Sequence, residues 1–405
     1  MHGAGDVRMV IRFLIANAFS VGGTIRTTFM TAEQLAREHE VEVVSVYRLA
    51  ETASLELDPR VRLRVLTDLR PAAVGRAQRP AVDRPSRLIH PDDIRYPRFN
   101  LLTDAALLRF LRSVRDGVLI GTRPGLNLAI ARHARREVIR IGQDHMNLEY
   151  RPGLLKAMAS RYPRLDAVTA LTEGTAAGYR ELLGPGCRVE CIPNAAPADL
   201  GRRADLDSRC VMAAGSLSRR KGFDRLLEAW ARLAPRHPDW RLEIYGDGRD
   251  RAELEQLIDD LGIHGSARLC GYSPRLLEEL ERASVFAMTS RKEGFPMVIL
   301  EAMSLGIPVV AYDFPTGPRD IITDGSDGFL VPDGRTRLLA EALDALMRDA
   351  HRRRSFSDAA LGKVAAYRID TIGARWEALF DELAASRRGG PKASRRDGAI
   401  ARAPA

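Results

Sequence analysis

Short apolar runs alternate with longer amphipathic stretches along most of the chain. Apolar runs of the kind that form buried strands occur at residues 9–15, 41–46, 118–120, 138–141, 167–171, 210–213, 241–245, 267–269, 284–288, 307–311 and 328–331. Stretches with helical periodicity lie between them, at residues 24–37, 103–114, 223–233, 251–261, 274–282 and 336–347, after residues 125 and 173, and before residue 306. Strands separated by helices are typical of parallel sheets, so the sequence predicts an α/β fold of two Rossmann-like βαβ domains with a deep cleft between them.

The alternation of strands and helices is interrupted at two places. Residues 70–100 contain five prolines among arginines, which predicts a long loop. Residues 195–207 form a connection rich in small residues, and we expect the domain boundary there. The predicted units are an N-terminal domain at 1–193, a second domain at 194–366, a C-terminal helix at 367–385 that packs back on the first domain, and a disordered basic tail at 386–405.

The chain has 405 residues, of which 45% are hydrophobic, and this is enough for two cores. No stretch reaches the ~20 apolar residues needed to span a bilayer. The run at 7–19 contains two arginines, so it predicts a first strand rather than a signal peptide. Cys187, Cys191, Cys210 and Cys270 lie in or beside apolar runs without zinc-ligand spacing, which favours buried thiols in a reducing compartment, the cytoplasm.

The positive charge is concentrated in two segments. The net charge of +9 equals the sum of +5 in residues 386–405 and +4 in residues 70–98. Aromatic residues make up only 6% of the chain, and nucleic-acid binders usually spread basic residues over a folded face, so a nucleic-acid partner is disfavoured. Two local basic patches favour peripheral contact with the anionic inner face of a membrane, or a phosphate-bearing acceptor. The alternative for the tail is a solvated segment without a partner.

The nonapeptide from Glu293 to Glu301 carries a glutamate at each end and lies between a predicted strand and a predicted helix. Pro296 fits the first helical position and Gly306 fits just past the helix end. A helix start of this kind offers unpaired N–H groups to an anion. One carboxylate could then face a reacting group while the other faces a hydroxyl further along the ligand. The alternative is an amphipathic core helix with two solvated acids.

Two glycine pairs follow predicted strands. Gly22 and Gly23 follow the first strand and open a helix, so their backbone could approach a phosphate closely. The spacing G-x-G-x-x-G is missing, which argues against a nicotinamide site. Gly246 and Gly248 also lack a third glycine and are consistent with a simple turn.

A basic loop and a histidine add candidate chemistry. Residues 215–222 place Arg219, Arg220 and Lys221 between a strand and a helix, and the chain contains only five lysines. A compact ammonium suits a diphosphate, although a merely solvated loop would have the same composition. His145 follows a strand, where sites are common in such folds, but a lone histidine is often structural.

Together these residues resemble the retaining nucleotide-sugar glycosyltransferases of family 4, which have the fold called GT-B. The resemblance covers most of residues 9–383 and is strongest over 211–331. There the motifs appear in the family's order: Gly215…Lys221-Gly222, Tyr245-Gly-Asp-Gly248, Gly271-Tyr272, Glu293…Glu301, Ala302-Met303, Gly306-Ile-Pro-Val and Gly328-Phe-Leu-Val-Pro. The segment Pro315-Thr-Gly-Pro318 is similar to that of members acting on cell-envelope polysaccharides or teichoic-acid-type glycans.

The resemblance implies that the domain at 1–193 is the acceptor side and that the domain at 194–366 binds the nucleotide-sugar, and it implies a role for each matching residue. His145 and Glu293 would contact the transferred sugar as catalytic residues. The remaining residues would bind the donor: Gly22 and Gly23 at the phosphate and sugar, Lys221 with Met297 and Val298 at the diphosphate, Glu301 at the ribose, Gly271 and Tyr272 at the base, and Gly294, Phe295 and Pro296 within the motif. Ser216 stands where many members have arginine, and Arg219 or Arg220 would have to replace that cation.

The resemblance further implies transfer of a hexose or N-acetylhexosamine, with retention, from a nucleotide-sugar, preferably a UDP-sugar. The acceptor would be a hydroxyl of a glycan, lipid-linked or cell-envelope molecule. No residue stands out as a nucleophile, which favours front-face displacement, and we expect no cofactor and no metal. The alternatives on the same fold are a sugar-nucleotide epimerase, an α-glucan phosphorylase and a non-catalytic sugar-nucleotide-binding protein.

Overall fold

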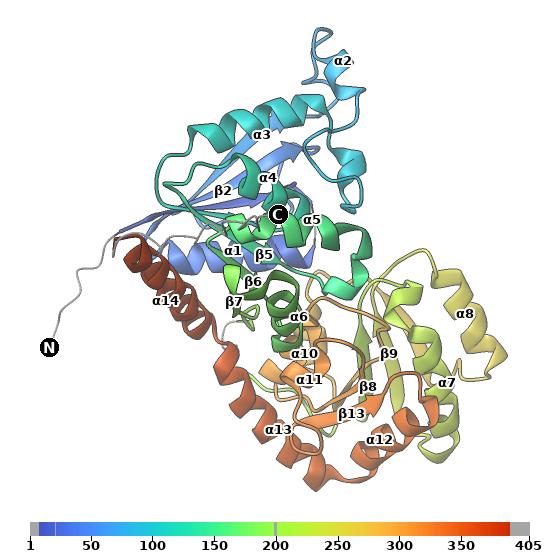
Figure 1. Cartoon of the computed structure of the whole chain (residues 1–405). Coiled ribbons are helices and arrows are strands. Elements are labelled where there is room, and N and C mark those ends of the chain that lie inside the picture. Colours follow the sequence, from blue (N-terminus) through green and yellow to red (C-terminus); the bar gives the residue numbers. More distant parts are fainter. Residues whose placement is uncertain (1–7, 21, 198–200, 389–405) are drawn as a thin grey trace, which may run out of the picture.

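The computed structural model describes residues 8–20, 22–197 and 201–388, and it contains two parallel sheets (Figure 1). The first has the strand order β3-β2-β1-β4-β5-β6-β7 and the second β10-β9-β8-β11-β12-β13. Every pairing within both sheets is parallel, as expected for strands connected by helices. The prediction of an α/β fold with two Rossmann-like sheets is therefore confirmed, whereas the domain limits at 193 and 366 stay a prediction.

The first sheet has buried central strands and two edge strands that the apolar pattern did not reveal. Its strands are β1 (Val10–Ile15), β2 (Glu40–Arg48), β3 (Val61–Asp68), β4 (Val118–Gly121), β5 (Ile139–Asp144), β6 (Ala167–Ala170) and β7 (Arg188–Cys191). Its helices are α1 (Gly23–Leu35), α2 (Arg79–Val82), α3 (Leu101–Ser113), α4 (Pro124–His133), α5 (Leu155–Arg161) and α6 (Glu173–Leu183). The edge strands β3 and β7 carry arginines among their apolar residues, so they lack the continuous apolar run of a central strand.

The second sheet follows the sequence prediction closely. Its strands are β8 (Cys210–Ala214), β9 (Arg241–Tyr245), β10 (Ala267–Gly271), β11 (Val285–Met288), β12 (Val309–Asp313) and β13 (Gly328–Pro332). Its helices are α7 (Phe223–Leu233), α8 (Arg251–Asp260), α9 (Leu276–Leu280), α10 (Met297–Ser304), α11 (Pro318–Ile321), α12 (Thr336–Arg348) and α13 (Ala350–Val364). Helix α13 was not predicted, because three consecutive arginines obscure the face that it buries.

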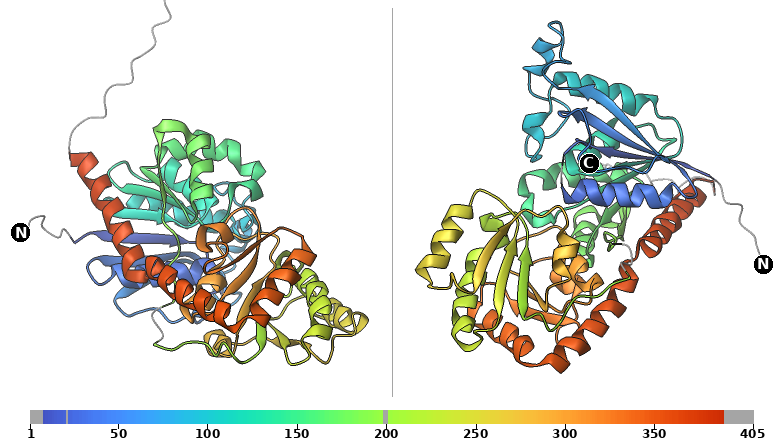
Figure 2. Two further views of the ribbon diagram at one scale, coloured as in Figure 1. Left: turned by 90° about the horizontal axis from the view of Figure 1, so that it is seen from below. Right: turned by 180° about the vertical axis from the view of Figure 1, so that it is seen from behind.

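The last helix, α14 (Ile369–Arg388), crosses from the second sheet to the first, and α13 and α14 run along one side of both halves (Figure 2). Its Trp376 is 1% exposed and lies edge-on to Phe13 of β1, with ring centroids 6.5 Å apart. The helix includes residues 386–388, which were expected to belong to a disordered tail. Arg387 is held there because its guanidinium donates to the Val138 carbonyl at 2.7 Å. Residues 389–405 of the expected tail lie outside the described residues.

The segment 70–100 is only partly the loop that its prolines predict. It contains α2, and its second half is tied to α3 by the buried carboxylate of Asp104. That carboxylate accepts hydrogen bonds from the Ser86 hydroxyl at 2.6 Å and from the Arg87 amide at 2.7 Å. Asn100 caps α3 by accepting from the Thr103 amide at 3.0 Å. The buried Asp104 carboxylate and the Asn100 cap therefore hold a segment that has little regular structure.

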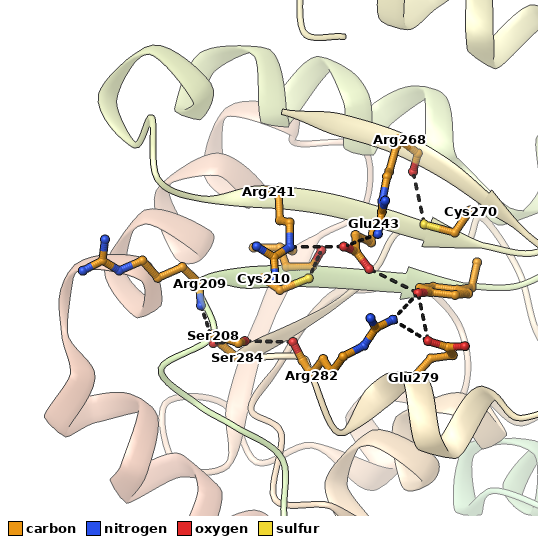
Figure 3. A network of polar contacts seen from close by, with 12 residues as sticks. Ser208, Arg209, Cys210, Arg241, Glu243, Arg268, Cys270, Glu279, Arg282 and Ser284 are labelled. Atoms are coloured by element: carbon orange, nitrogen blue, oxygen red, sulfur yellow. Dashed lines mark hydrogen bonds and ion pairs between the residues drawn. The ribbon is translucent and has the colours of Figure 1, made fainter. Parts of the chain in front are cut away.

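A polar network closes one edge of the second sheet (Figure 3). Glu243 of β9 is 2% exposed, and its carboxylate accepts hydrogen bonds from Arg241 at 3.1 Å and from Arg268 at 2.8 Å. The Tyr245 hydroxyl also donates to this carboxylate, at 3.2 Å. Because each polar group of Glu243 has a partner, this buried charge is a structural feature of the edge.

The structure shows how far the four cysteines are buried and how long and apolar the helices are. Cys187 and Cys210 are buried, while Cys191 and Cys270 are partly exposed, so the prediction that all four thiols are buried was half right. Among the described helices, each is too short or too polar to cross a membrane.

Candidate active site between the two sheets

A cavity of about 880 Å³ opens at the carboxyl ends of the first sheet's strands, where α/β folds usually place their ligands. We call it the cleft cavity. Its lining on the first-sheet side includes Ala16 after β1, Thr122 after β4 and His145 after β5. Arg220 and Lys292 from the second half complete the lining. The strand-end position of His145 was thus a good guide to the cavity.

The helix of the nonapeptide begins one residue later than expected. Pro296 precedes α10 with a φ of −82° and a ψ of 77°, and helical residues start at Met297. The Pro296 carbonyl accepts from the Ile299 amide at 2.9 Å, while the Met297 amide donates to the Phe295 carbonyl at 2.9 Å. Pro296 therefore caps the helix instead of occupying its first position. At the other end Gly306 has a φ of +73° just past the helix, as predicted.

Glu293 forms a compact ion cluster with the basic loop of residues 215–222. Its carboxylate lies 2.7 Å from Lys221 Nζ and 2.5 Å from an Arg220 guanidinium nitrogen, and it accepts from the Ser290 hydroxyl at 3.0 Å. Burial raises the pKa of Glu293, but the charges of Lys221 and Arg220 outweigh it and leave this pKa below its ordinary value. At neutral pH the cluster therefore contains one carboxylate and two cations.

Gly215 makes room for the lysine of this cluster. A Cβ at Gly215 would lie 2.7 Å from Lys221 Cε and 3.1 Å from its Nζ, and the backbone has a φ of +153° that favours glycine. The small residue that starts the loop thus determines where the ammonium lies.

Glu301 faces the first half of the molecule. It is 5% exposed, and one carboxylate oxygen accepts from an Arg26 guanidinium nitrogen at 2.6 Å. Arg26 belongs to α1, the helix that Gly22 and Gly23 open. The sequence analysis missed Arg26, although its place in the first turn of a helix that follows a strand end was a usable signal.

His145 is 9% exposed, and neither of its ring nitrogens has a hydrogen-bond partner among the described residues. Burial, with the charges of Arg151 and Arg123, lowers the pKa of His145 to about 3. The imidazole is therefore neutral at physiological pH, with one nitrogen able to donate and one able to accept. An unpartnered neutral imidazole beside a cavity is suited to contact a hydroxyl-rich ligand.

A buried network that the sequence analysis missed holds the end of β5, directly before His145. The Asp144 carboxylate lies 2.9 Å from an Arg151 guanidinium nitrogen and accepts from the Tyr179 hydroxyl at 2.5 Å. Burial raises the pKa of Asp144, while Arg151 and the Tyr179 hydroxyl act in the opposite direction. This network fixes the backbone from which His145 extends.

The two halves touch directly at the start of the nonapeptide. A Cβ at Gly294 would lie 1.8 Å from the His145 carbonyl oxygen, so glycine alone permits this approach. Asn147 Nδ2 donates to the Glu293 carbonyl at 3.2 Å, and the Tyr150 hydroxyl donates to the Pro315 carbonyl at 2.8 Å. The Thr316 hydroxyl donates to Asn147 Oδ1 at 2.8 Å. Glu293 and His145 are therefore held on facing sides of one contact.

Other sequence candidates lie at varied distances from this contact. Gly22 and Gly23 line the cleft cavity, and a Cβ at either would meet no atom within 4 Å. Ser216 is exposed, with its hydroxyl 3.1 Å from that of Ser218. Tyr272 is 70% exposed and follows Gly271 at the end of β10, outside the cavity lining. Met297 and Val298 are half-buried, and Phe295 is buried.

The arrangement is rich in fixed charge and in hydrogen-bonding groups. Within the described part of the chain, no three His, Cys, Asp or Glu side chains gather as a metal site would require. Arg220 joins the cavity to the ion cluster, whereas Arg219 is exposed and contributes its carbonyl to Arg291. Two cations beside a helix start can bind a diphosphate, and the neutral histidine opposite can contact the group attached to it.

Comparison with known proteins identifies the second half of the chain. Residues 202–362 match the family described as glycosyl transferases group 1, so the chain contains a group 1 glycosyltransferase domain. An exopolysaccharide phosphotransferase of Streptomyces coelicolor is 37% identical over 399 residues, which are 95% of this chain and 42% of that protein. The chain thus spans less than half the length of this relative.

Three further known proteins each match more than nine-tenths of the chain. A Campylobacter jejuni α-1,4-N-acetyl-D-galactosaminyltransferase that acts on an undecaprenol-diphosphate-linked glycan is 26% identical, over 93% of this chain and 99% of its own. Solved structures of TarM from S. aureus, with UDP, and of HepE from Anabaena, with UDP-glucose, superpose with TM-scores of 0.73 and 0.72. They are 14% and 18% identical and cover 92% and 93% of this chain and 100% of their own. The fold is therefore GT-B.

Proposed function

We propose that the protein is a retaining glycosyltransferase that moves a hexose or N-acetylhexosamine from a UDP-sugar to a hydroxyl of a cell-envelope or lipid-linked glycan. The observation that carries the proposal is that the ion cluster of Glu293, Lys221 and Arg220 directly precedes Gly294, which approaches the backbone of His145. The group 1 domain supports the donor class, and the names of the relatives from Streptomyces and Campylobacter support an envelope or lipid-linked acceptor.

In this mechanism the second half binds the donor. A diphosphate would compete with Glu293 for Lys221 and Arg220, and Arg220 would supply the cation that Ser216 does not. The carboxylate of Glu293 would then accept hydrogen bonds from sugar hydroxyls, with Glu301 at the ribose. Gly271 and Tyr272 would contact the base. The amides at the start of α10, Met297 and Val298 among them, would add the field of the helix end.

The chemical step would be a front-face displacement. The acceptor oxygen forms a bond to the anomeric carbon on the face from which the diphosphate oxygen leaves, and the departing oxygen takes the acceptor's proton. Among the described residues that line the cleft cavity, the acids are Asp92 and Asp93, and Asp93 is paired with Arg123 at 3.1 Å. Neither is presented as a nucleophile. The residues of the site would act by positioning and by stabilising the leaving diphosphate, without a metal.

Contact with the inner face of a membrane is a further part of the proposal. The segment 70–98 lies on the acceptor-side half and carries the excess arginines that would approach anionic lipid. Sedimentation with phosphatidylglycerol vesicles at low salt should retain the full chain. If the chain stays in the supernatant under those conditions, the proposed membrane contact is wrong.

Lys221→Ala tests the central assignment. The substitution should lower kcat/KM for donor turnover by roughly 30- to 1,000-fold, because removing one preorganised donor costs on the order of 2–4 kcal/mol in the transition state. Turnover is measured as release of UDP from UDP-glucose and UDP-N-acetylglucosamine, and binding as thermal stabilisation by each nucleotide-sugar. Lys156→Ala, an exposed lysine outside the cavity lining, is the matched control. If Lys221→Ala turned over the donor at the wild-type rate, the assignment of this cluster as the diphosphate-binding site would be wrong.

A further inference from the structure

Two arginines in the cleft cavity have no acidic partner. Arg95 and Arg98 are exposed, line the cavity on the first-sheet side, and form no ion pair with any described residue. The other arginines of the cavity do form ion pairs, with guanidinium-to-carboxylate distances between 2.5 and 3.1 Å: Arg123 with Asp93, Arg151 with Asp144 and Arg220 with Glu293. The guanidinium groups of Arg95 and Arg98 are therefore available to bind a ligand.

The backbone that carries these arginines is held in place by a buried acid. Asp93 is 3% exposed, and its carboxylate accepts from the Gly125 amide of α4 at 2.9 Å and from the Arg95 amide at 2.9 Å. A Cβ at Gly125 would lie 2.7 Å from this carboxylate, so the small residue makes the contact possible. These hydrogen bonds hold the backbone of the two arginines against α4, so the arginines lie at the cavity on an ordered segment.

The unpaired arginines share the cavity with His145. Tyr47, which is 2% exposed, lines the same cavity as Arg95, Arg98 and Arg123. Both unpaired arginines and His145 line this one cavity, and its volume of about 880 Å³ accommodates a substrate that reaches from the arginines to the histidine.

We propose that the acceptor substrate carries a phosphate or phosphodiester group, which Arg95 and Arg98 bind while the acceptor hydroxyl lies beside His145. This inference rests on the proposed function and names the acceptor class. Arginine presents a planar fork of donors that matches phosphate oxygens, and two such forks can engage one group together. Apart from Asp93, which is paired with Arg123, the acid among the described lining residues is Asp92. Asp92 is exposed and its carboxylate lies 3.7 Å from the His90 imidazole. One acid beside two unpaired arginines leaves this side of the cavity with a net positive charge.

The test measures binding of a synthetic glycerol-phosphate hexamer to the full chain by calorimetry, with maltohexaose and inorganic phosphate as comparison probes. Arg95→Gln/Arg98→Gln should weaken hexamer binding about 10- to 100-fold, as expected when charged hydrogen bonds are lost. Arg76→Gln/Arg79→Gln, which removes the same charge from exposed positions of the same segment outside the cavity, should leave it unchanged.

UDP binding in the same samples separates this inference from the proposed function. Wild-type UDP affinity in both double variants shows that they are folded, and UDP that fails to bind even the wild type would refute the donor assignment alone. The inference is overturned if the hexamer does not bind, if both double variants weaken it equally, or if maltohexaose binds as tightly. Arginine substitutions that weaken binding of inorganic phosphate but leave binding of the hexamer unchanged would likewise overturn it, because the anion site would then not belong to an acceptor within the cavity.

Discussion

The two sides of the cleft hold their positive charge differently. On the second-sheet side Lys221 and Arg220 are both paired with Glu293 within two short loops. On the first-sheet side Arg95 and Arg98 face the cavity with no acidic partner among the described residues. An anion that binds Lys221 and Arg220 must replace the carboxylate of Glu293, so its affinity depends on the geometry of the new contacts. An anion that binds the unpaired Arg95 and Arg98 is attracted by their net positive charge. Ligand affinity on the first-sheet side should therefore fall more steeply with salt.

Among the substitutions that test this comparison, the largest effect is expected where the two sides touch. Gly294→Ala would place a Cβ 1.8 Å from the His145 carbonyl oxygen, so the backbone must move apart there. A misplacement of about 1 Å can cost on the order of 100-fold in rate, and we expect a fall of that size in kcat for donor turnover. UDP affinity should change only a few-fold, because Lys221 and Arg220, which would bind the diphosphate, are not substituted.

Gly265→Ala is the control for that substitution. Gly265 is exposed, and a Cβ there would meet no atom within 4 Å. Wild-type kcat in Gly294→Ala would show that the contact between the sides has no part in turnover.

Lowering the pH should affect the two sides of the cleft differently: His145 should reduce the free energy of unfolding, whereas Glu293 should stay ionised. The pKa of His145 is lowered to about 3 in the folded chain, so the unfolded chain binds an extra proton below about pH 6.5. The stabilising contribution is complete above that pH and is lost as the pH falls toward 3. From pH 7 to pH 5 it amounts to about 2 kcal/mol. The lowered pKa of Glu293 keeps the second side ionised over the same window.

Urea unfolding of His145→Asn at pH 7 and pH 5 measures this difference. The variant should lose about 2 kcal/mol less than the wild type between the two pH values. His264→Asn, at an exposed position, should behave as the wild type does. Equal losses in all three proteins would mean that His145 is not held neutral.

A smaller effect is expected at a single hydrogen bond between the sides. Tyr150→Phe removes the bond to the Pro315 carbonyl but keeps the ring that lies 4.9 Å from Lys292 Nζ. A bond of this kind contributes on the order of 0.5–1.5 kcal/mol, and solvent exposure favours the lower end. Tyr96→Phe removes a similar bond, to the Ser86 carbonyl at 3.0 Å, within the first half. Only Tyr150→Phe should slow donor turnover; equal rates in both variants would contradict the comparison.

The sequence predicted the second-sheet side better because its chemistry is local. Lys221 and Glu293 each lie in a short loop that begins at the end of a strand, and such loops are legible from glycine spacing and charge. The wall of Arg95 and Arg98 depends on Asp93 reaching α4, a contact between segments that no periodicity reveals. Arg26 was missed for the same reason, because its partner Glu301 lies 275 residues away.

The errors in the fold follow the same division. Central strands of continuous apolar residues were found, whereas β3 was missed because Arg62 and Arg64 interrupt its pattern. Helix α13 was missed because its buried face includes Arg353, whose guanidinium donates to the Leu346 carbonyl at 2.7 Å. Pro296 was placed one residue too far into α10, a boundary error that sequence patterns commonly leave.

The packing of α14 on β1 has a consequence for the order of synthesis. Trp376, which covers Phe13, lies 363 residues later in the chain (376 − 13) and therefore emerges from the ribosome much later. At about 5–20 residues per second the first sheet must wait tens of seconds with part of one apolar face uncovered. Its strands could pair early, yet the native core of this half closes only when α14 has emerged. A nascent or prematurely terminated chain would therefore expose this face to aggregation and to chaperones.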